Sequence, residues 1–484
     1  MPLPDSNTPD DLEFRPGLVL GETGTENAVD TAVRTDVASF ARVRWSPEPL
    51  DLEGEDIELL SVSDLPGSSE TVKLPFRLVH HELSEWEERV FAGEFRTQRP
   101  SLVRSYFANG GDTVHLVDLT FSVPAFDPSG LEEDEDPELI AEQRLEVAFL
   151  RFYSWVFERL DDYGAGGISQ ICLPELWLRQ VHLLPTVWGM AATFARRTGN
   201  RFIVADSCPP FGMLQDAERA RARAEGYELE AEELTPAALV PWYREAKWQG
   251  REDVPTEAAL TIDALDSTRE NLRRSPTTLS CLAVYWPWVR THRGMTLPPC
   301  GAVAGVYARS DDENQPVGVM KPPANETVKD IQDVALHLDE QPKNLLQRKG
   351  INLLQARTGK GIIIWGARTL SQDELWRFVN VRRLIGYIGK QLEMDNQWAI
   401  FENNTLSLRQ RVERDAKYFL HDLFELGALR GDTPDTAYIV KCNEENNPDE
   451  VVEAGILVVD VWVNPVQTNE FVHLQLKYGD ASVQ

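Results

Sequence analysis

The chain of 484 residues has few cysteines, no long apolar run and too few basic residues to balance its acidic ones. Its cysteines are an odd five, widely scattered and without a C-x-x-C pair, which excludes a disulfide framework and a zinc-finger pattern. This spacing favours small buried hydrophobic side chains in a reducing compartment. The cysteines are Cys172, Cys208, Cys281, Cys300 and Cys442.

No apolar run approaches the roughly 18 residues that a helix needs to span a bilayer. The most apolar stretches, 281–289, 361–367 and 455–463, have the length of strands. The first residues, MPLPDSNTPDDLEF, are acidic and contain prolines, and they lack the basic and apolar regions of a secretory signal. We therefore expect a protein that is made and kept in the cytoplasm, without direct membrane insertion.

The charge balance is strongly acidic, with 78 acidic and 48 basic residues and a formal net charge of −30. A surface of this sign repels nucleic acid and anionic membranes, so nucleic acid is not an expected partner. Like charge also delays the association of copies until a specific interface forms. Halophilic solubility explains the same charge equally well. The 42% hydrophobic and 26% charged residues are ordinary for a globular protein.

Strand-like and helix-like patterns are interspersed along the chain and predict a mixed α/β fold with several domains. Residues 113–121 and 201–206 are predicted as strands, and apolar spacings of three and four predict a helix over 139–160. The Pro298-Pro299 pair marks an expected change of domain.

After this pair the pattern predicts three helices and two strands. The helices are expected over 326–338, 372–396 and 405–429, and one strand over 361–365. The second strand, 456–463, is apolar on both faces apart from Asp460, which is typical of a central strand.

Each chain end is predicted to carry a strand behind a flexible segment. Residues 1–15 are polar and proline-rich, and Leu18, Val19 and Leu20 follow them. Near the other end Pro465 precedes the alternating segment Phe471, Val472, His473, Leu474, Gln475 and Leu476. Such strands can pair within their own subunit, or leave it and join the sheet of a neighbour.

The sequence offers no convincing catalytic pattern. Residues 357–361, RTGKG, have some features of a phosphate loop, but Leu354 and Gly361 stand where a Walker motif needs Gly and Ser or Thr. His80 and His81 are adjacent, which fits two surface histidines better than a pair of metal ligands. Residues 286–288, WPW, lie in an apolar strand and favour packing over a ligand platform. We therefore predict no enzymatic activity and no cofactor or metal.

Several segments match, in order, the pattern of contractile-tail sheath proteins. Early ones are 15–19, RPGLV, 33–40, and 105–111, SYFANGG. The more specific ones follow residue 280: 285–288, 298–309, 321–326, 359–362, 365–371, 379–384, 397–402, 427–429 and 440–442. The chain therefore resembles the sheath subunits of contractile phages and of phage-like injection machines.

The resemblance implies a conserved inner domain and an outer α/β domain that varies between members. We expect an N-terminal arm (1–20), an outer α/β domain (21–297, with its variable part at about 130–270), an inner, tube-facing domain (298–464) and a C-terminal arm strand (465–484). It also implies hexameric rings of this chain, stacked as a helix around an inner tube of a different protein. Baseplate and terminator or cap proteins would bind the ends of such a sheath, in a phage tail or phage-like particle.

A sheath of this kind must contract without falling apart and without ATP. Strand addition keeps copies linked while flexible segments swing, and a metastable extended lattice stores the driving free energy. The helix over 405–429 carries Arg409, Arg411, Arg414 and Lys417, which we expect to face an acidic tube. A solvated amphipathic helix explains these residues equally well. The competing hypotheses are a static helical coat or filament protein and an unrecognised α/β enzyme.

Overall fold

The computed structural model describes the chain between residues 37 and 468, with gaps inside this range. The gaps are 47–49, 51–56, 64, 69, 85–97, 125–127, 129–135, 163–167, 175, 226, 273–274 and 315–316. Both predicted arm strands, 18–20 and 471–476, lie outside the described residues. Of the helices in the described part, none is both long and apolar enough to cross a bilayer.

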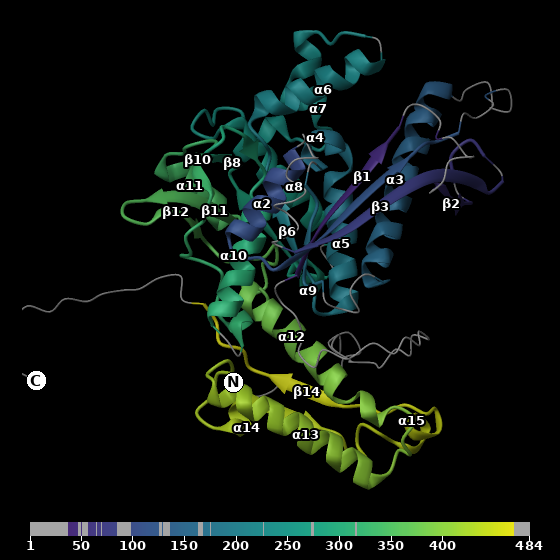
Figure 1. Cartoon of the computed structure of the whole chain (residues 1–484), viewed down its shortest axis with the longest axis vertical. Coiled ribbons are helices and arrows are strands. Elements are labelled where there is room, and N and C mark those ends of the chain that lie inside the picture. Colours follow the sequence, from purple (N-terminus) through teal and green to yellow (C-terminus); the bar gives the residue numbers. More distant parts are fainter. Residues whose placement is uncertain are drawn as a thin grey trace, which may run out of the picture.

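A nine-stranded sheet runs through the larger of two lobes (Figure 1). Its strands are β1 Val37–Trp45, β2 Ile57–Val62, β3 Val72–Ser84, β4 Thr113–Phe121, β5 Gln170–Cys172, β6 Phe202–Asp206, β7 Leu282–Trp286, β11 Ile351–Arg357 and β12 Gly361–Trp365. They lie in the order β12-β11-β7-β6-β5-β1-β4-β3-β2. The middle of the sheet, from β11 to β4, is parallel, and β12, β3 and β2 extend it in antiparallel pairs.

Helices cover both faces of this sheet. One core contains residues of α3 Pro137–Asp162, α5 Leu184–Thr198 and α8 Thr256–Asn271, and a second contains residues of α2 Gln98–Ala108 and α10 Cys300–Glu313. Strand β6 contributes to both, because Ile203 lies in the first core and Val204 in the second. A strand that is buried on both faces has a continuous apolar sequence. That is why residues 201–206 could be recognised in advance.

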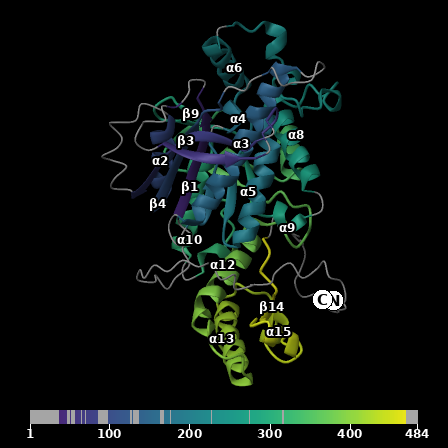
Figure 2. The ribbon, with the colours of Figure 1, turned by 90° about the vertical axis from the view of Figure 1, so that its right-hand side faces the viewer.

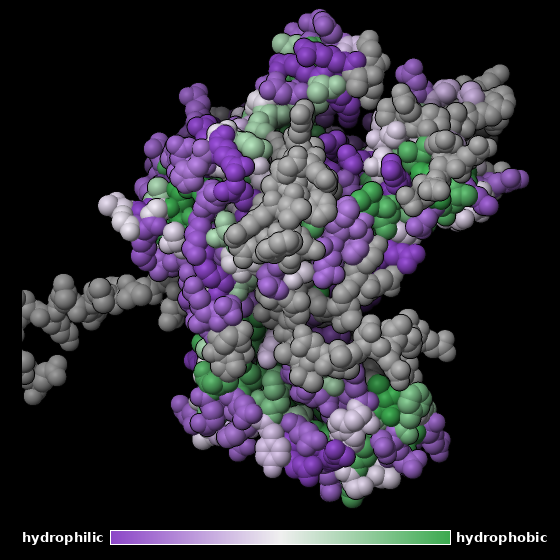
Figure 3. Space-filling model, in the orientation of Figure 1, coloured by the Kyte–Doolittle hydropathy of each residue, from purple (hydrophilic) through white to green (hydrophobic). Residues whose placement is uncertain are grey.

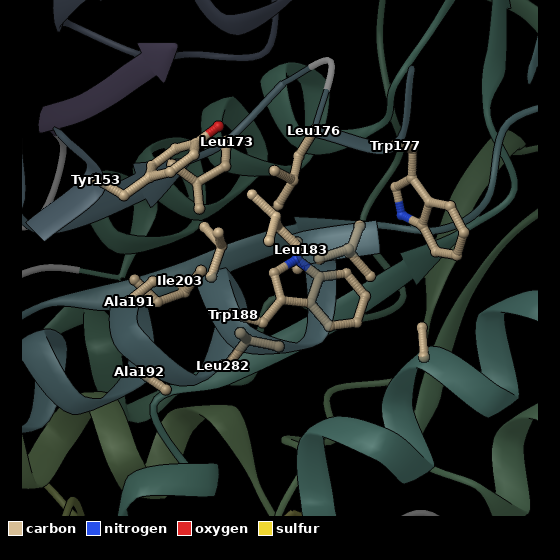
Figure 4. Close-up of a cluster of buried hydrophobic side chains, with 14 of the residues drawn as sticks. Tyr153, Leu173, Leu176, Trp177, Leu183, Trp188, Ala191, Ala192, Ile203 and Leu282 are labelled. Atoms are coloured by element: carbon tan, nitrogen blue, oxygen red, sulfur yellow. The ribbon is translucent and has the colours of Figure 1, made fainter. Parts of the chain in front are cut away.

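Large aromatic side chains fill the first core. Figure 4 shows Trp188 of α5 beside Leu282 and Ile203, with Tyr153 of α3 and Trp177 in the same cluster. Trp177 meets Trp188 edge to face, with ring centroids 6.3 Å apart. Its indole nitrogen donates to the Asp206 carbonyl oxygen at 2.8 Å, so its polar atom is satisfied despite burial. The cluster fixes the helix layer on the sheet.

The smaller lobe is built from the C-terminal part of the described chain. It contains α13 Leu406–Glu425, α14 Pro434–Ala437, α15 Asp449–Glu453 and a two-stranded antiparallel sheet of β13 Tyr438–Lys441 and β14 Asp460–Val463. Helix α12, Val379–Asp395, leads from one lobe into the other (Figures 1 and 2). Its first residue, Val379, lies in the second core of the large lobe, whereas Leu384, Ile388 and Leu392 lie in the core of the small lobe.

The start of α12 is firmly attached to the large lobe. The Arg383 guanidinium makes two hydrogen bonds to the Asp311 carboxylate of α10, at 3.0 and 2.5 Å, and both side chains are buried. Gly386 lies so close to Gly199 that an added Cβ would come within 2.5 Å of its carbonyl oxygen. These contacts attach α12, which also packs in the core of the small lobe, to the large lobe.

Several sequence predictions are confirmed. Residues 113–121 form β4, residues 361–365 form β12, and the helix predicted over 139–160 is α3. The helix predicted over 405–429 is α13, with Thr405 as the N-cap that accepts the amide of Leu408. The mixed α/β fold class is confirmed as well. All five cysteines are buried and free, as their scatter suggested.

Three predictions are wrong. The helix over 326–338 is absent: the amide of Val328 bonds to the Ile362 carbonyl of β12, and strand β10 Ile331–Val334 follows. The helix over 372–396 begins only at Val379. The strand over 456–463 is shortened to β14, which has a single partner strand in the described part of the chain and is not central there. In the first case, non-local strand pairing overrode the helical pattern. In the third case, only residues 460–463 pair with another strand of the described chain.

The sheet continues across the expected domain boundary at residue 298. Helix α10 packs against α2, and β11 pairs in parallel with β7. The division at 298 stays a prediction.

Candidate assembly interface

The two-stranded sheet of the small lobe has one covered and one open face. Val440 is buried against the core that α13 also forms, whereas Ile439 and Trp462 are 39% and 45% exposed. Ile439 and Trp462 are direct cross-strand partners, so the open face carries a continuous apolar pair. A two-stranded sheet is marginally stable alone, and this one is supported on one face only.

The chain leaves this sheet along a defined path. Asn464 donates its amide to the Ala437 carbonyl at 2.9 Å, and Val466 donates to Ala428 at 3.1 Å. Asn380 of α12 then donates its side-chain amide to the Val466 carbonyl at 3.2 Å and accepts the Thr468 hydroxyl at 2.8 Å. The C-terminal segment is thus held up to Thr468 on the sheet and on α12. Sequence reasoning missed Asn380, because nothing local marks its side chain as a partner for residues 86 and 88 positions away.

Exposed apolar side chains gather on the small lobe. Of the fourteen large apolar side chains that are exposed in the described residues, eight lie between residues 401 and 466. These eight are Phe401, Leu406, Tyr418, Leu426, Ile439, Ile456, Trp462 and Val466. Apolar colour is visible on this lobe in Figure 3. Such a concentration is typical of a surface that another chain covers.

Phe401 is the most exposed of these residues. Its side chain is 96% exposed, and its backbone has φ of +65°, a conformation that non-glycine residues rarely adopt. A bulky residue held in this conformation has a cost, which the surrounding structure must offset. The sequence contains it in the matching segment 397–402, but neither its exposure nor its strain is readable there.

The four basic residues predicted to touch a tube do not form one face. Arg411, Arg414 and Lys417 are exposed, whereas Arg409 is partly buried and its Nε donates to the side-chain Oδ1 of Asn404 at 3.0 Å. The Arg411 guanidinium lies 3.8 Å from the ring centroid of Trp398. Lys417 pairs with Glu413 at 2.6 Å, and Arg414 lies 3.4 Å from Asp415. Neighbouring carboxylates on α13 therefore offset much of the positive charge.

The opposite side of α13 faces the core of the small lobe, as its pattern predicts. Val412, Leu420 and Leu423 are buried, and Phe419 packs against them partly exposed. Cys442 lies under this layer, and burial raises the pKa of its thiol to about 11. A thiol with this pKa stays protonated and unreactive at neutral pH.

The described residues contain no group of three His, Cys, Asp or Glu side chains that could hold a metal ion. The RTGKG segment is the tip of the β11–β12 hairpin, between two antiparallel strands. It has no helix N-terminus, so it does not form a phosphate loop.

Comparison with known proteins matches two consecutive regions of the chain to protein families. Residues 274–370 match the phage tail sheath protein central domain, and residues 371–477 match the phage tail sheath C-terminal domain. Residues 274–477 therefore carry two consecutive domains of the phage tail sheath family. The two matched regions meet at residues 370 and 371, between β12 and α12, and the second contains the whole small lobe.

Curated members of the sheath family align with part of the chain. The tail sheath protein of Vibrio phage KVP40 is 26% identical over 185 residues, which is 38% of this chain and 26% of the phage protein. The tail sheath protein of Salmonella phage ViI is 26% identical over 182 residues, 37% of this chain and 27% of its own length. The alignments therefore span about a quarter of these relatives.

Solved sheath structures share the fold over nearly the whole chain. The PVC sheath complex of an extracellular contractile injection system, in its contracted state, has a TM-score of 0.56 at 19% identity and covers 95% of this chain and 98% of that one. The helical sheath of the anti-feeding prophage, also contracted, has a TM-score of 0.55 at 20% identity and covers 96% and 99%. The similarity in fold thus includes the region before residue 274.

Proposed function

We propose that this chain is the structural subunit of a contractile sheath. It polymerises as stacked hexameric rings around an inner tube and contracts from a metastable extended state, which drives the tube through a target envelope. The proposal places the chain in a phage tail or phage-like particle, assembled in the cytoplasm, with baseplate and terminator or cap proteins at the ends. The two matching sheath-family domains and the fold shared with contracted sheaths support it.

The observation that carries the proposal is the small, half-covered sheet of β13 and β14. It has two strands in the described residues, so each strand has one outer edge. An unpaired edge beside an exposed apolar face is a template for a strand from another chain. The two predicted arm strands, Leu18 to Leu20 and Phe471 to Leu476, would supply the missing neighbours from adjacent copies.

Strand addition of this kind gives a strong but mobile linkage. About five backbone hydrogen bonds at roughly 1 kcal/mol each, together with buried alternate side chains, make each linkage worth several kcal/mol. The segment behind Thr468 starts from a fixed point on α12, which sets where the C-terminal arm departs. Copies stay joined through such arms while their bodies rotate.

The tube contact is the second part of the proposal. Arg411, Arg414 and Lys417 lie together on the exposed side of α13 and remain the residues that we propose to face the tube, with Arg409 supporting the helix start. Their intrahelical carboxylate partners reduce the expected strength of the contact. Charge reversal at Arg411 and Arg414 should weaken co-assembly with the tube and its salt dependence. Unchanged co-assembly would refute the assignment.

Contraction of such a lattice needs no bound nucleotide, because free energy stored in assembly is released by repacking. We accordingly propose a structural protein without catalytic activity or cofactor. A static filament is the alternative, and micrographs showing tubes of one length and width under every condition would favour it.

The decisive experiment removes residues 1–20 and 466–484 from the full chain and images the particles. We expect folded subunits that form no ordered cylinders. Trp462→Ser removes an exposed apolar side chain from the sheet of β13 and β14, which we propose to accept strands from neighbouring copies. This substitution should impair assembly. Tyr227→Ser is the matched control, because Tyr227 is equally exposed, at 44% against 45%, but lies in the large lobe. Normal cylinders that still shorten after the double truncation would sink the proposal.

A further inference from the structure

The tip of the β11–β12 hairpin is a basic surface in a strongly acidic protein. Residues 356–361 are all exposed, and they include Arg357 and Lys360. Lys360 donates to the Asn325 side-chain carbonyl at 3.2 Å, and Arg357 has an aromatic contact. Within the described residues neither cation has a carboxylate partner. The chain carries a net charge of −30, so two unpaired cations on one exposed turn need an explanation.

Arg357 is held in a conformation suited to binding a carboxylate. Its guanidinium carbon lies 4.3 Å from the ring centroid of Trp365, which is 37% exposed. Stacking on an aromatic face leaves the edges of the guanidinium free to donate two parallel hydrogen bonds. It also restricts the side chain beforehand, which lowers the entropic cost of binding. The hairpin tip thus presents a pre-oriented guanidinium whose free edges can bind a carboxylate.

An acidic surface lies on the opposite flank of the large lobe. Glu138, Glu142 and Glu146 follow one another at intervals of four along α3, so they share one side of that helix. Glu138 and Glu142 are exposed and have no ion pair among the described residues. Burial raises the pKa of Glu146, and the charge of Glu142 raises it further; the His182 imidazole lies 3.7 Å from the Glu146 carboxylate. Like charges at this spacing destabilise a helix unless a partner compensates them.

Figure 1 shows the hairpin on one flank of the large lobe and α3 on the other. The two surfaces therefore do not meet within one chain, and a contact between them requires two copies. A contact between two different patches of identical chains repeats from copy to copy, and it closes into a ring or continues as a helix.

We propose that the β11–β12 hairpin of one copy binds the acidic side of α3 on the next copy, with Arg357 and Lys360 facing Glu138 and Glu142. The inference rests on the proposed function, because it needs copies to assemble. It adds a second lateral contact, in the large lobe, that does not depend on the chain ends. The contact is polar and partly exposed, so it sets the register between copies and can be released and remade.

The test uses the full-length chain and compares four proteins. R357E with K360E reverses the hairpin charge, and E138K with E142K reverses the α3 charge. The third protein carries all four substitutions. The fourth is a control, R219E with R223E on α6 Phe211–Glu225, which changes the net charge as much as the hairpin variant does. Sedimentation and electron micrographs report the critical concentration for assembly, and thermal melting of the dissociated chains reports their folding.

Each double reversal should raise the critical concentration at least about tenfold, because like charges would then oppose each other. The critical concentration of the fourfold variant should return toward that of the unmodified chain. The α6 control should have the same critical concentration as the unmodified chain. The hairpin assignment is overturned if R357E with K360E behaves like the control, or if the fourfold variant assembles no better than the double variants. Failure of the unmodified chain to assemble at all would instead refute the sheath proposal and the hairpin contact with it.

Discussion

A buried carboxyl group, that of Asp206, lies where β6 meets the start of α10 in the large lobe. Asp206 ends β6, and its carboxylate accepts the amide of Cys300 at the start of α10 at 2.8 Å. Burial raises the pKa of Asp206 to about 7. In the unfolded chain this group has a pKa of about 4. The folded state therefore keeps its proton over a range in which the unfolded state has lost it.

The contribution of Asp206 to the stability of the subunit should consequently fall as pH rises from about 4 to about 7, and it should be constant above that. Asp206→Asn keeps the hydrogen-bond acceptor and removes the titration. Relative to the unmodified chain, the variant should gain about 2–3 kcal/mol in unfolding free energy between pH 5 and pH 8. Urea unfolding of the dissociated chain at both pH values measures this gain. Asp216→Asn, on the exposed side of α6, is the control, and an equal gain there would contradict the explanation.

At the scale of elements, close backbone approach decides how helices pack. Gly305 in the middle of α10 lies against α2, and a Cβ added there would come within 2.2 Å of the Tyr106 carbonyl oxygen and 2.7 Å of the Asn109 Cβ. These contacts leave no room for a side chain. The same α2–α10 pair forms the layer over one face of the sheet, so its spacing affects the whole second core.

Gly305→Ala should therefore destabilise the subunit by about 1–3 kcal/mol through overpacking. An alanine in a helix is ordinarily more favourable than a glycine by up to about 1 kcal/mol. Gly212→Ala on α6 is the matched control, because nothing lies within 4 Å of a Cβ there. We expect this control to be neutral or stabilising. Denaturant unfolding of both variants tests the comparison, and equal effects would show that the close approach is not limiting.

At the scale of the whole molecule, the two lobes differ in the size of their cores. The two cores of the large lobe surround a nine-stranded sheet, whereas the small lobe has a short sheet covered on one face. Local opening costs less free energy where fewer apolar contacts hold a segment. Helix α12 belongs to both lobes, so it should keep their arrangement even when β13 and β14 open.

Amide hydrogen exchange should show that the small lobe opens more readily than the large lobe, and that assembly changes this. In dissociated chains the amides of β13 and β14 should exchange faster than those of β6 and β7. In assembled particles the β13 and β14 amides should become protected, because strands from neighbouring copies would pair with both edges. Exchange in β6 provides an internal reference that assembly should leave unchanged. Persistently fast exchange of β13 and β14 in particles would argue against this sheet as the acceptor.

The sequence by itself determined the elements whose burial repeats locally. The continuous apolar run of β6, the spacing in α3 and the apolar side of α13 each follow from contacts that recur within one strand or one helix turn. The ordered matching segments after residue 280 likewise indicated the family. None of these required knowledge of distant residues.

Only the tertiary structure decided which edges and side chains remain uncovered. The pattern of 456–463 is that of a central strand, yet β14 has one partner strand among the residues that the structure describes, because pairing depends on residues far away in sequence. Contacts between residues far apart in sequence also decide three other features. They are the exposure of Phe401, the position of Arg409 away from Arg414, and the stacking of Arg357 on Trp365. Local periodicity reports how an element is buried, whereas an open surface is defined by what the rest of the chain leaves uncovered.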